Sequence, residues 1–127
     1  MTAKKVMVVD DSRTVQELVS SAFVRHGFDV VCASDGIDGI EKLALNDDVA
    51  LIFCDVNMPR MSGLDMISEV RRIDKYASIP VVMLTTEGRP ELMRRAKDAG
   101  AKAWIVKPFK PEQLVAVVKK LIDDRTE

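Results

Sequence analysis

Several side chains that can do chemistry stand where short apolar runs of the sequence end. The runs 6–9, 51–54, 81–84 and 103–106 are followed by Asp10-Asp11, Asp55, Thr85 and Lys107, respectively. Carboxylates, hydroxyls and ammonium groups bind metal ions, hold phosphates and act as nucleophiles. If these runs are parallel strands of one sheet, the groups after them meet at one edge of that sheet.

Three carboxylates gathered at one edge need positive charge. Two like charges about 4 Å apart repel by roughly 4 kcal/mol at an effective dielectric of about 20. Lys107 supplies one positive charge, which does not balance Asp10, Asp11 and Asp55. An all-oxygen site with spare negative charge suits Mg²⁺, which keeps water positions that a phosphate can take. The residues therefore predict Mg²⁺-dependent phosphoryl transfer, in which a carboxylate can be the covalent acceptor.

Each residue also has a purely structural interpretation. Asp10-Asp11 could favour a helix N-terminus, and Asp55 could open a turn. Thr85 could cap the next segment, and Lys107 before a proline could be a solvated loop residue. We favour the functional interpretation because all these groups coincide at the ends of different apolar runs.

The elements that must position these groups alternate along the chain. Strand-like runs occupy 6–9, 30–33, 51–55, 81–84 and 103–106, and we expect all of them to be buried. Between them lie helical stripes expected to face inward: Val15, Leu18, Val19, Ala22, Phe23; Ile37, Ile40, Leu43, Ala44; Leu64, Ile67, Val70; Leu92, Met93, Ala96, Ala99; Leu114, Val117, Val118, Leu121. Asp35-Gly36 is expected to be a turn, and Ser62 an N-cap. Five strands alternating with five helices predict an α/β, doubly wound parallel sheet covered on both faces.

The composition is typical of one globular domain over residues 1–127. Basic and acidic residues are balanced, 19 against 20, which argues against a nucleic-acid binder. No apolar run approaches the ~20 residues of a membrane span, so we expect a cytoplasmic protein without a membrane partner. Cys32 and Cys54 lie inside apolar runs without metal-ligand spacing, and both are expected to be core thiols.

Short motifs at the predicted strand ends strengthen this interpretation. They are Val8-Val9-Asp10-Asp11-Ser12, Asp55-Val56-Asn57-Met58-Pro59, Ser62-Gly63, Leu84-Thr85 and Lys107-Pro108-Phe109. As a set, and over essentially the whole chain, they resemble the receiver domains of two-component response regulators, in particular single-domain, CheY-like chemotaxis regulators. The resemblance implies a flavodoxin-like fold with strand order 2-1-3-4-5 and a cis peptide at Lys107-Pro108.

The resemblance also implies a phosphoacceptor and a metal site. Asp55 would take a phosphoryl group from the phosphohistidine of a sensor histidine kinase. Asp55 would also belong to a Mg²⁺ site that Asp11 joins directly, Asp10 through water and Asn57 through its backbone carbonyl. The protein would be a signalling phosphoacceptor and not an enzyme, catalysing only its own phosphorylation and slow self-dephosphorylation.

A switch and its partners follow from the same resemblance. Lys107 would pair with the phosphoryl oxygens, Thr85 would swing in to hydrogen-bond one of them, and Trp104 would follow as the aromatic switch, a position usually held by Tyr or Phe. Output would run through the face formed by the fourth helix, fifth strand and fifth helix. The expected partner of this monomer is a protein such as a flagellar motor switch component, with a phosphatase as a further candidate.

Other hypotheses remain open. A flavodoxin-like electron carrier would share the sheet, but Asp10-Asp11 would repel the flavin phosphate. A Mg²⁺-dependent phosphatase with an aspartyl-phosphate intermediate would resemble D-x-D at the nucleophile, whereas Asn57 stands where the second, general-acid Asp would be. The chain could also be the receiver part of a larger regulator or of a phosphorelay.

Overall fold

The computed structural model describes residues 4–46, 48–86 and 89–125, and in these residues five parallel strands form one sheet. The strands are β1 (Lys5–Val9), β2 (Asp29–Ala33), β3 (Val49–Asp55), β4 (Val81–Thr85) and β5 (Ala103–Val106). Their spatial order is β2-β1-β3-β4-β5, which confirms the predicted order. Asp55 is the last residue of β3, the central strand.

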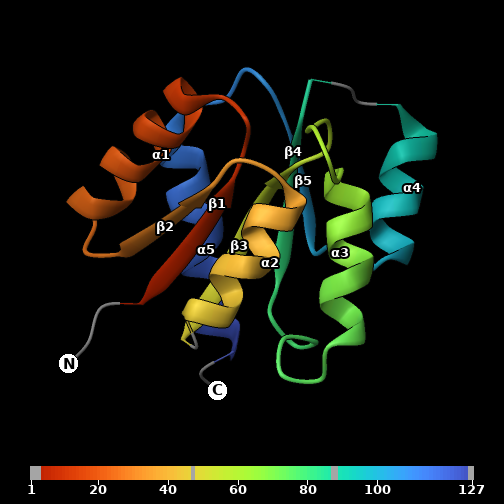
Figure 1. Ribbon diagram of the computed structural model, residues 1–127. Coiled ribbons are helices and arrows are strands. Elements are labelled where there is room, and N and C mark those ends of the chain that lie inside the picture. The colour runs from red at the N-terminus through yellow and green to blue at the C-terminus, as the bar shows by residue number, and fades with distance from the viewer. Residues whose placement is uncertain (1–3, 47, 87–88, 126–127) are drawn as a thin grey trace.

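Helices cover both faces of this sheet (Figure 1). Those of the described residues are α1 (Arg13–Arg25), α2 (Gly36–Leu45), α3 (Gly63–Arg72), α4 (Pro90–Asp98) and α5 (Pro111–Arg125). α1 and α5 pack together on one face, and α2, α3 and α4 follow one another across the other. None of the described helices is long and apolar enough to cross a membrane. The predicted doubly wound α/β architecture is confirmed.

The sheet separates two apolar cores. Successive side chains of β3 alternate between them: Ile52 and Cys54 face the core under α2, α3 and α4, whereas Leu51 and Phe53 face the core under α1 and α5. All four of these residues are fully buried. Phe53 packs against Phe23 of α1, with ring centroids 5.6 Å apart. The strand that ends on Asp55 is therefore fixed from both sides.

Burial differs from the prediction at the edges of the fold. β2 and β5 are only partly buried, because the strand order leaves each of them with one neighbouring strand. Leu18, Ala44 and Met93 are exposed although they were assigned to inward stripes. Leu18 borders a hollow beside Pro108, and Met93 borders another beside β5, so these helices bury a narrower stripe than the pattern indicated.

Polar side chains cap α2 and α3, which begin at the edge of the sheet where β3 ends on Asp55. Ser62 accepts the Asp65 N–H at 3.2 Å, which confirms it as the N-cap of α3. The expectation of a simple turn at Asp35-Gly36 was wrong. Asp35 caps α2 by accepting the Asp38 N–H at 2.8 Å, so Gly36 is already helical.

Candidate functional site

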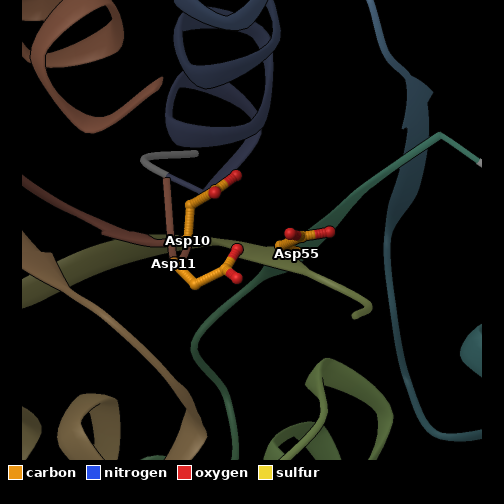
Figure 2. Close-up of side chains that lie close together, drawn as sticks. All are labelled: Asp10, Asp11 and Asp55. Carbon is orange, nitrogen blue, oxygen red and sulfur yellow. The ribbon is translucent and has the colours of Figure 1, made fainter. Parts of the chain in front are cut away.

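Three carboxylates lie together where β1 and β3 end (Figure 2). One carboxylate oxygen from each of Asp10, Asp11 and Asp55 lies within 4.8 Å of the other two. Asp10 and Asp55 are buried, and Asp11 is exposed. The strand register produces this arrangement, because Val9 pairs with Cys54 and the residue that follows each of them in the chain is an aspartate. The predicted convergence of these carboxylates is thus present.

The loop between β1 and α1 holds Asp10 through several hydrogen bonds. The Asp10 N–H donates to the Ala33 carbonyl at 3.0 Å, and its Oδ1 accepts the Ser12 N–H at 2.8 Å. Gln16 Nε2 donates to the carbonyls of both Asp10 (2.7 Å) and Ala33 (3.2 Å). Gln16 was not singled out from the sequence, since a polar residue on a helix carries no signal of such a contact.

Lys107 reaches the carboxylates from the end of β5. Its Nζ lies 2.7 Å from Asp10 Oδ2 and 3.4 Å from Asp55 Oδ2. The Lys107 N–H donates to the Thr85 carbonyl at 2.7 Å, which continues the pairing of β4 with β5 and fixes the lysine backbone. The Lys107–Pro108 peptide is cis, as the resemblance implied. The structure therefore brings this cation to the two buried carboxylates.

The charges of the cluster perturb one another. Burial raises the pKa of Asp55, and the charge of Asp10 raises it further, while Lys107 opposes both effects. Burial acts to lower the pKa of Lys107, but the carboxylates of Asp10 and Asp55 outweigh it and raise that pKa above its usual 10.5. Lys107 is thus charged at neutral pH, and its single positive charge is shared between the two buried carboxylates.

The donor set fits a small, hard cation. Asp10, Asp11 and Asp55 offer carboxylate oxygens that converge, and exposed Asp11 leaves the cluster open to water. Asn57 comes two residues after Asp55 in the chain, and its backbone N–H donates to Asp55 Oδ1 at 3.4 Å. Oxygen ligands, excess negative charge and access for water are what Mg²⁺ requires. The predicted acidic cluster is therefore present, and these residues could hold such an ion.

Thr85 and Trp104 lie on one face of the sheet. Thr85 is fully buried at the end of β4, and strand alternation places it on the same side as Met83, whose partner in the register is Trp104. Trp104 packs on the core under α4 and lines a hollow of about 440 Å³ between α4 and β5. Among the described residues its Nε1–H is buried without a hydrogen-bond partner. The indole ring thus extends from the core to a surface hollow.

Contacts at two places fix the loop between β3 and α3. The Gly63 N–H donates to the Val56 carbonyl at 3.0 Å, and a Cβ on Gly63 would collide with the Asp55 carbonyl oxygen, so only glycine fits there. Arg60 has a left-handed backbone (φ 62°), and its guanidinium pairs with Asp35. The sequence interpretation missed both partners of this ion pair. The only available signal was the capping position of Asp35 before α2.

Comparison with known proteins agrees with this geometry. The family model of the response regulator receiver domain matches residues 6–119. The chemotaxis protein CheY1 of Helicobacter pylori is 40% identical over 111 residues, which are 87% of this chain and 90% of that protein. A chemotaxis protein CheY homolog of Campylobacter jejuni is 38% identical over 121 residues, 94% of this chain and 90% of that protein.

The same likeness holds in three dimensions. The solved structure of the chemotaxis response regulator CheY4 of Vibrio cholerae has a TM-score of 0.86 at 39% identity, covering 94% of this chain and 98% of that one. The fold, the residues at the strand ends and the relatives all lead to one assignment. The chain belongs to the family of response regulator receiver domains.

Proposed function

We propose that this receiver domain accepts a phosphoryl group on Asp55 from the phosphohistidine of a sensor kinase. The supporting observation is the place of Asp55, which ends the central strand 3.4 Å from Lys107 Nζ and within the cluster formed with Asp10 and Asp11. In the transfer, a carboxylate oxygen of Asp55 forms a bond to phosphorus. The P–N bond breaks, its electron pair returns to the imidazole, and Asp55 becomes an acyl phosphate.

The residues around Asp55 would each contribute to this step. Asp10, Asp11, Asp55 and the Asn57 carbonyl would hold Mg²⁺, which neutralises charge on the transferring group when it is bound. Lys107 already lies near both buried carboxylates, so its ammonium can exchange one of them for a phosphoryl oxygen in a charge-assisted hydrogen bond. Positioning and neutralisation of charge are the main catalytic effects in phosphoryl transfer.

A switch would follow from phosphorylation. A phosphoryl group on Asp55 would offer the Thr85 hydroxyl a new, charged acceptor. It would lie on the neighbouring strand, because β3 and β4 are paired in the sheet. Because Trp104 lies on the same face as Thr85, movement of the hydroxyl toward the phosphoryl group would leave room for the indole ring to move inward. A modification shifts such an equilibrium only as far as it favours one state over the other.

The output would be binding of a protein to the face formed by α4, β5 and α5. Trp104 lines the hollow on this face together with Arg94, Lys97 and Lys102, so a movement of the ring would change a basic surface. Relatives that are 38–40% identical are named chemotaxis proteins, which supports control of a flagellar motor switch, with a phosphatase to end the signal. A receiver within a phosphorelay or a larger regulator would use the same chemistry.

A phosphorylation assay tests the proposal. We expect incubation with acetyl phosphate and Mg²⁺ to add one phosphoryl group to the wild-type protein, measured as intact mass. Asp55→Asn should show no adduct, because its amide cannot form the acyl phosphate, and EDTA should suppress the wild-type adduct. A phosphoryl adduct of equal yield in Asp55→Asn would overturn the assignment.

A further inference from the structure

Arg60 lies outside the acidic cluster, yet its backbone has an uncommon conformation and its side chain forms an ion pair. Its φ of 62° lies in the left-handed region, which residues other than glycine, asparagine and aspartate rarely adopt. Its Nε and one terminal nitrogen donate to the two carboxylate oxygens of Asp35 at 2.8 and 3.1 Å. Uncommon backbone conformations persist where surrounding contacts determine them, and they cluster at functional sites. This bidentate pair joins the β3–α3 loop to the start of α2.

Met61 adds two further contacts at the same junction. The Gly36 N–H donates to the Met61 carbonyl at 3.2 Å. The Met61 side chain lies directly over Gly36, where an added Cβ would come within 2.6 Å of Met61 Cγ. The tip of the β3–α3 loop is thus docked on the first residue of α2 by charge, by a backbone hydrogen bond and by packing.

The segment that receives this loop also holds the other loop of the site. The Ala33 carbonyl, two residues before Asp35, accepts the Asp10 N–H at 3.0 Å and Gln16 Nε2 at 3.2 Å. Residues 33–36 therefore lie between the β1–α1 loop, which carries Asp10 and Asp11, and the β3–α3 loop, which carries Asn57. They contribute no ligand to the cluster, but they contact both loops that do.

We propose that Arg60 and Asp35 are positioning residues, whose ion pair holds the β3–α3 loop and its Asn57 carbonyl at a fixed place relative to Asp10 and Asp11. The inference rests on the proposed function, since this placement matters only if a cation binds between the two loops. The hydrogen bond from Arg60 lowers the pKa of Asp35 despite its burial, in agreement with a charged pair at neutral pH.

Electrostatics and positioning predict opposite signs for the loss of Arg60. Removing the positive charge of Arg60 makes the surroundings of the cluster more negative, so charge alone would tighten Mg²⁺ binding or leave it unchanged. Releasing the loop would instead weaken Mg²⁺ binding, because ordering the loop that carries the Asn57 carbonyl on binding adds an entropic cost. The sign of the change in Mg²⁺ affinity therefore separates the two explanations.

Arg60→Asn is the sharpest substitution, because asparagine tolerates the left-handed backbone, while its short, neutral side chain lacks the guanidinium that pairs with Asp35. Arg60→Gly accepts the same backbone and serves as an independent second variant. Arg60→Lys keeps the charge but loses the bidentate geometry. Arg72→Asn is the matched control, since it removes the same charge from an exposed pair with Glu69 on α3.

Calorimetric titration with MgCl₂ measures the effect. Loss of a partner bonded directly to a metal ligand typically costs 10- to 100-fold in metal affinity. Arg60 and Asp35 act through the loop that carries Asn57, so we expect an effect at the low end, about tenfold weaker Mg²⁺ binding in Arg60→Asn and Arg60→Gly. Arg60→Lys should lie between these variants and wild type, and Arg72→Asn should match wild type. In phosphorylation by acetyl phosphate, the Mg²⁺ concentration for half-maximal rate should rise by the same factor, while the rate at saturating Mg²⁺ stays close to that of wild type.

A double-mutant cycle tests whether the two residues act as a pair. Asp35→Asn keeps an oxygen that can cap α2, and its effect on Mg²⁺ affinity should not add to that of Arg60→Asn. Additive effects would overturn this inference and leave the proposed metal site standing. The same holds if folded Arg60→Asn and Arg60→Gly proteins bind Mg²⁺ as tightly as wild type or more tightly. A wild-type protein that binds no Mg²⁺ would overturn the proposed metal site together with it.

Discussion

Replacing Asp55 with asparagine is expected to stabilise the metal-free protein. Asparagine keeps the shape of the side chain and removes the charge that folding brings within 4.8 Å of Asp10 and Asp11. Burial and the charge of Asp10 raise the pKa of Asp55, so the ionised carboxylate is less favourable in the native state than in the unfolded chain. The variant lacks this penalty.

The size of the effect follows from the distances. At an effective dielectric of about 20, a carboxylate up to 4.8 Å away repels Asp55 by about 3.5 kcal/mol, and Lys107 at 3.4 Å attracts it by about 5 kcal/mol. The two repulsions together exceed the attraction by about 2 kcal/mol. Solvent around exposed Asp11 reduces this excess, and burial of Asp55 adds to it. We expect a gain of about 1–2 kcal/mol, or roughly 5 °C in Tm for a domain of this size.

The gain has a defined pH dependence. Because the pKa of Asp55 in the folded protein is raised above 3.8, the native state retains a proton that the unfolded chain loses as pH rises past that value. Wild-type stability therefore falls relative to the variant as pH rises from 3.8 through the folded-state pKa, and the full difference persists at pH values above that pKa. Below both values the two proteins should be equally stable. Urea unfolding in EDTA across this range measures the difference.

Two comparisons make the experiment decisive. Asp29→Asn removes an exposed carboxylate at the start of β2, and we expect a change within about 0.5 kcal/mol. Excess Mg²⁺ should raise the Tm of wild type more than that of Asp55→Asn, since it binds the native cluster. Equal unfolding midpoints for wild type and Asp55→Asn in EDTA at neutral pH, or a less stable variant, would refute the charge reasoning.

Further expectations concern other parts of the account. Lys107→Ala should destabilise the metal-free fold by about 2–3 kcal/mol in urea unfolding, because it leaves buried Asp10 without the ammonium 2.7 Å away. The stabilisation by Lys107 should persist up to pH 10.5 and be lost as pH rises through its raised pKa. Beryllofluoride with Mg²⁺, a phosphoryl mimic, should shift the fluorescence emission of Trp104, the only tryptophan, and Thr85→Ala should shrink the shift. The Cys54 thiol, whose pKa is raised by burial, should resist a thiol reagent until the protein unfolds.

Each of these expectations has its own control. Lys110→Ala removes an exposed lysine and should leave the urea midpoint unchanged. An equally unchanged midpoint in Lys107→Ala would contradict the pairing of Lys107 with buried Asp10. Asp55→Asn should abolish the emission shift, whereas an unchanged wild-type emission with the mimic bound would exclude Trp104 as the switch. Partly exposed Cys32 is an internal reference for labelling, and equally fast reaction of Cys54 would contradict a buried central strand.

Much of the fold could be predicted because central strands carry a strong signal. The apolar run 51–54 is fully buried, and it sets Asp55 at the strand end as predicted. The edge strands β2 and β5 have similarly apolar sequences, and burial there depends on the strand order, which the run alone does not contain. Leu18 and Met93 fit a helical stripe but lie at its border, where the shape of the neighbouring surface decides exposure.

The site was predictable only where strand topology determines it. Asp10 and Asp55 converge because parallel strands end at one edge, and this follows from a strand assignment. The pair of Arg60 with Asp35 joins residues 25 positions apart in two loops, whose paths no periodic pattern describes. Gln16 was missed for a similar reason, since its contact with Ala33 depends on how α1 leaves β1.

The central claim is that Asp55 itself carries the phosphoryl group, and chemical mapping tests it most directly. After incubation with acetyl phosphate and Mg²⁺, borohydride reduces an aspartyl phosphate to homoserine, which tandem mass spectrometry locates in the digested protein. The account predicts homoserine at position 55 alone, and none when EDTA replaces Mg²⁺. Homoserine at Asp10 or Asp11, or a stable phosphoryl group on any other residue with position 55 unmodified, would contradict it.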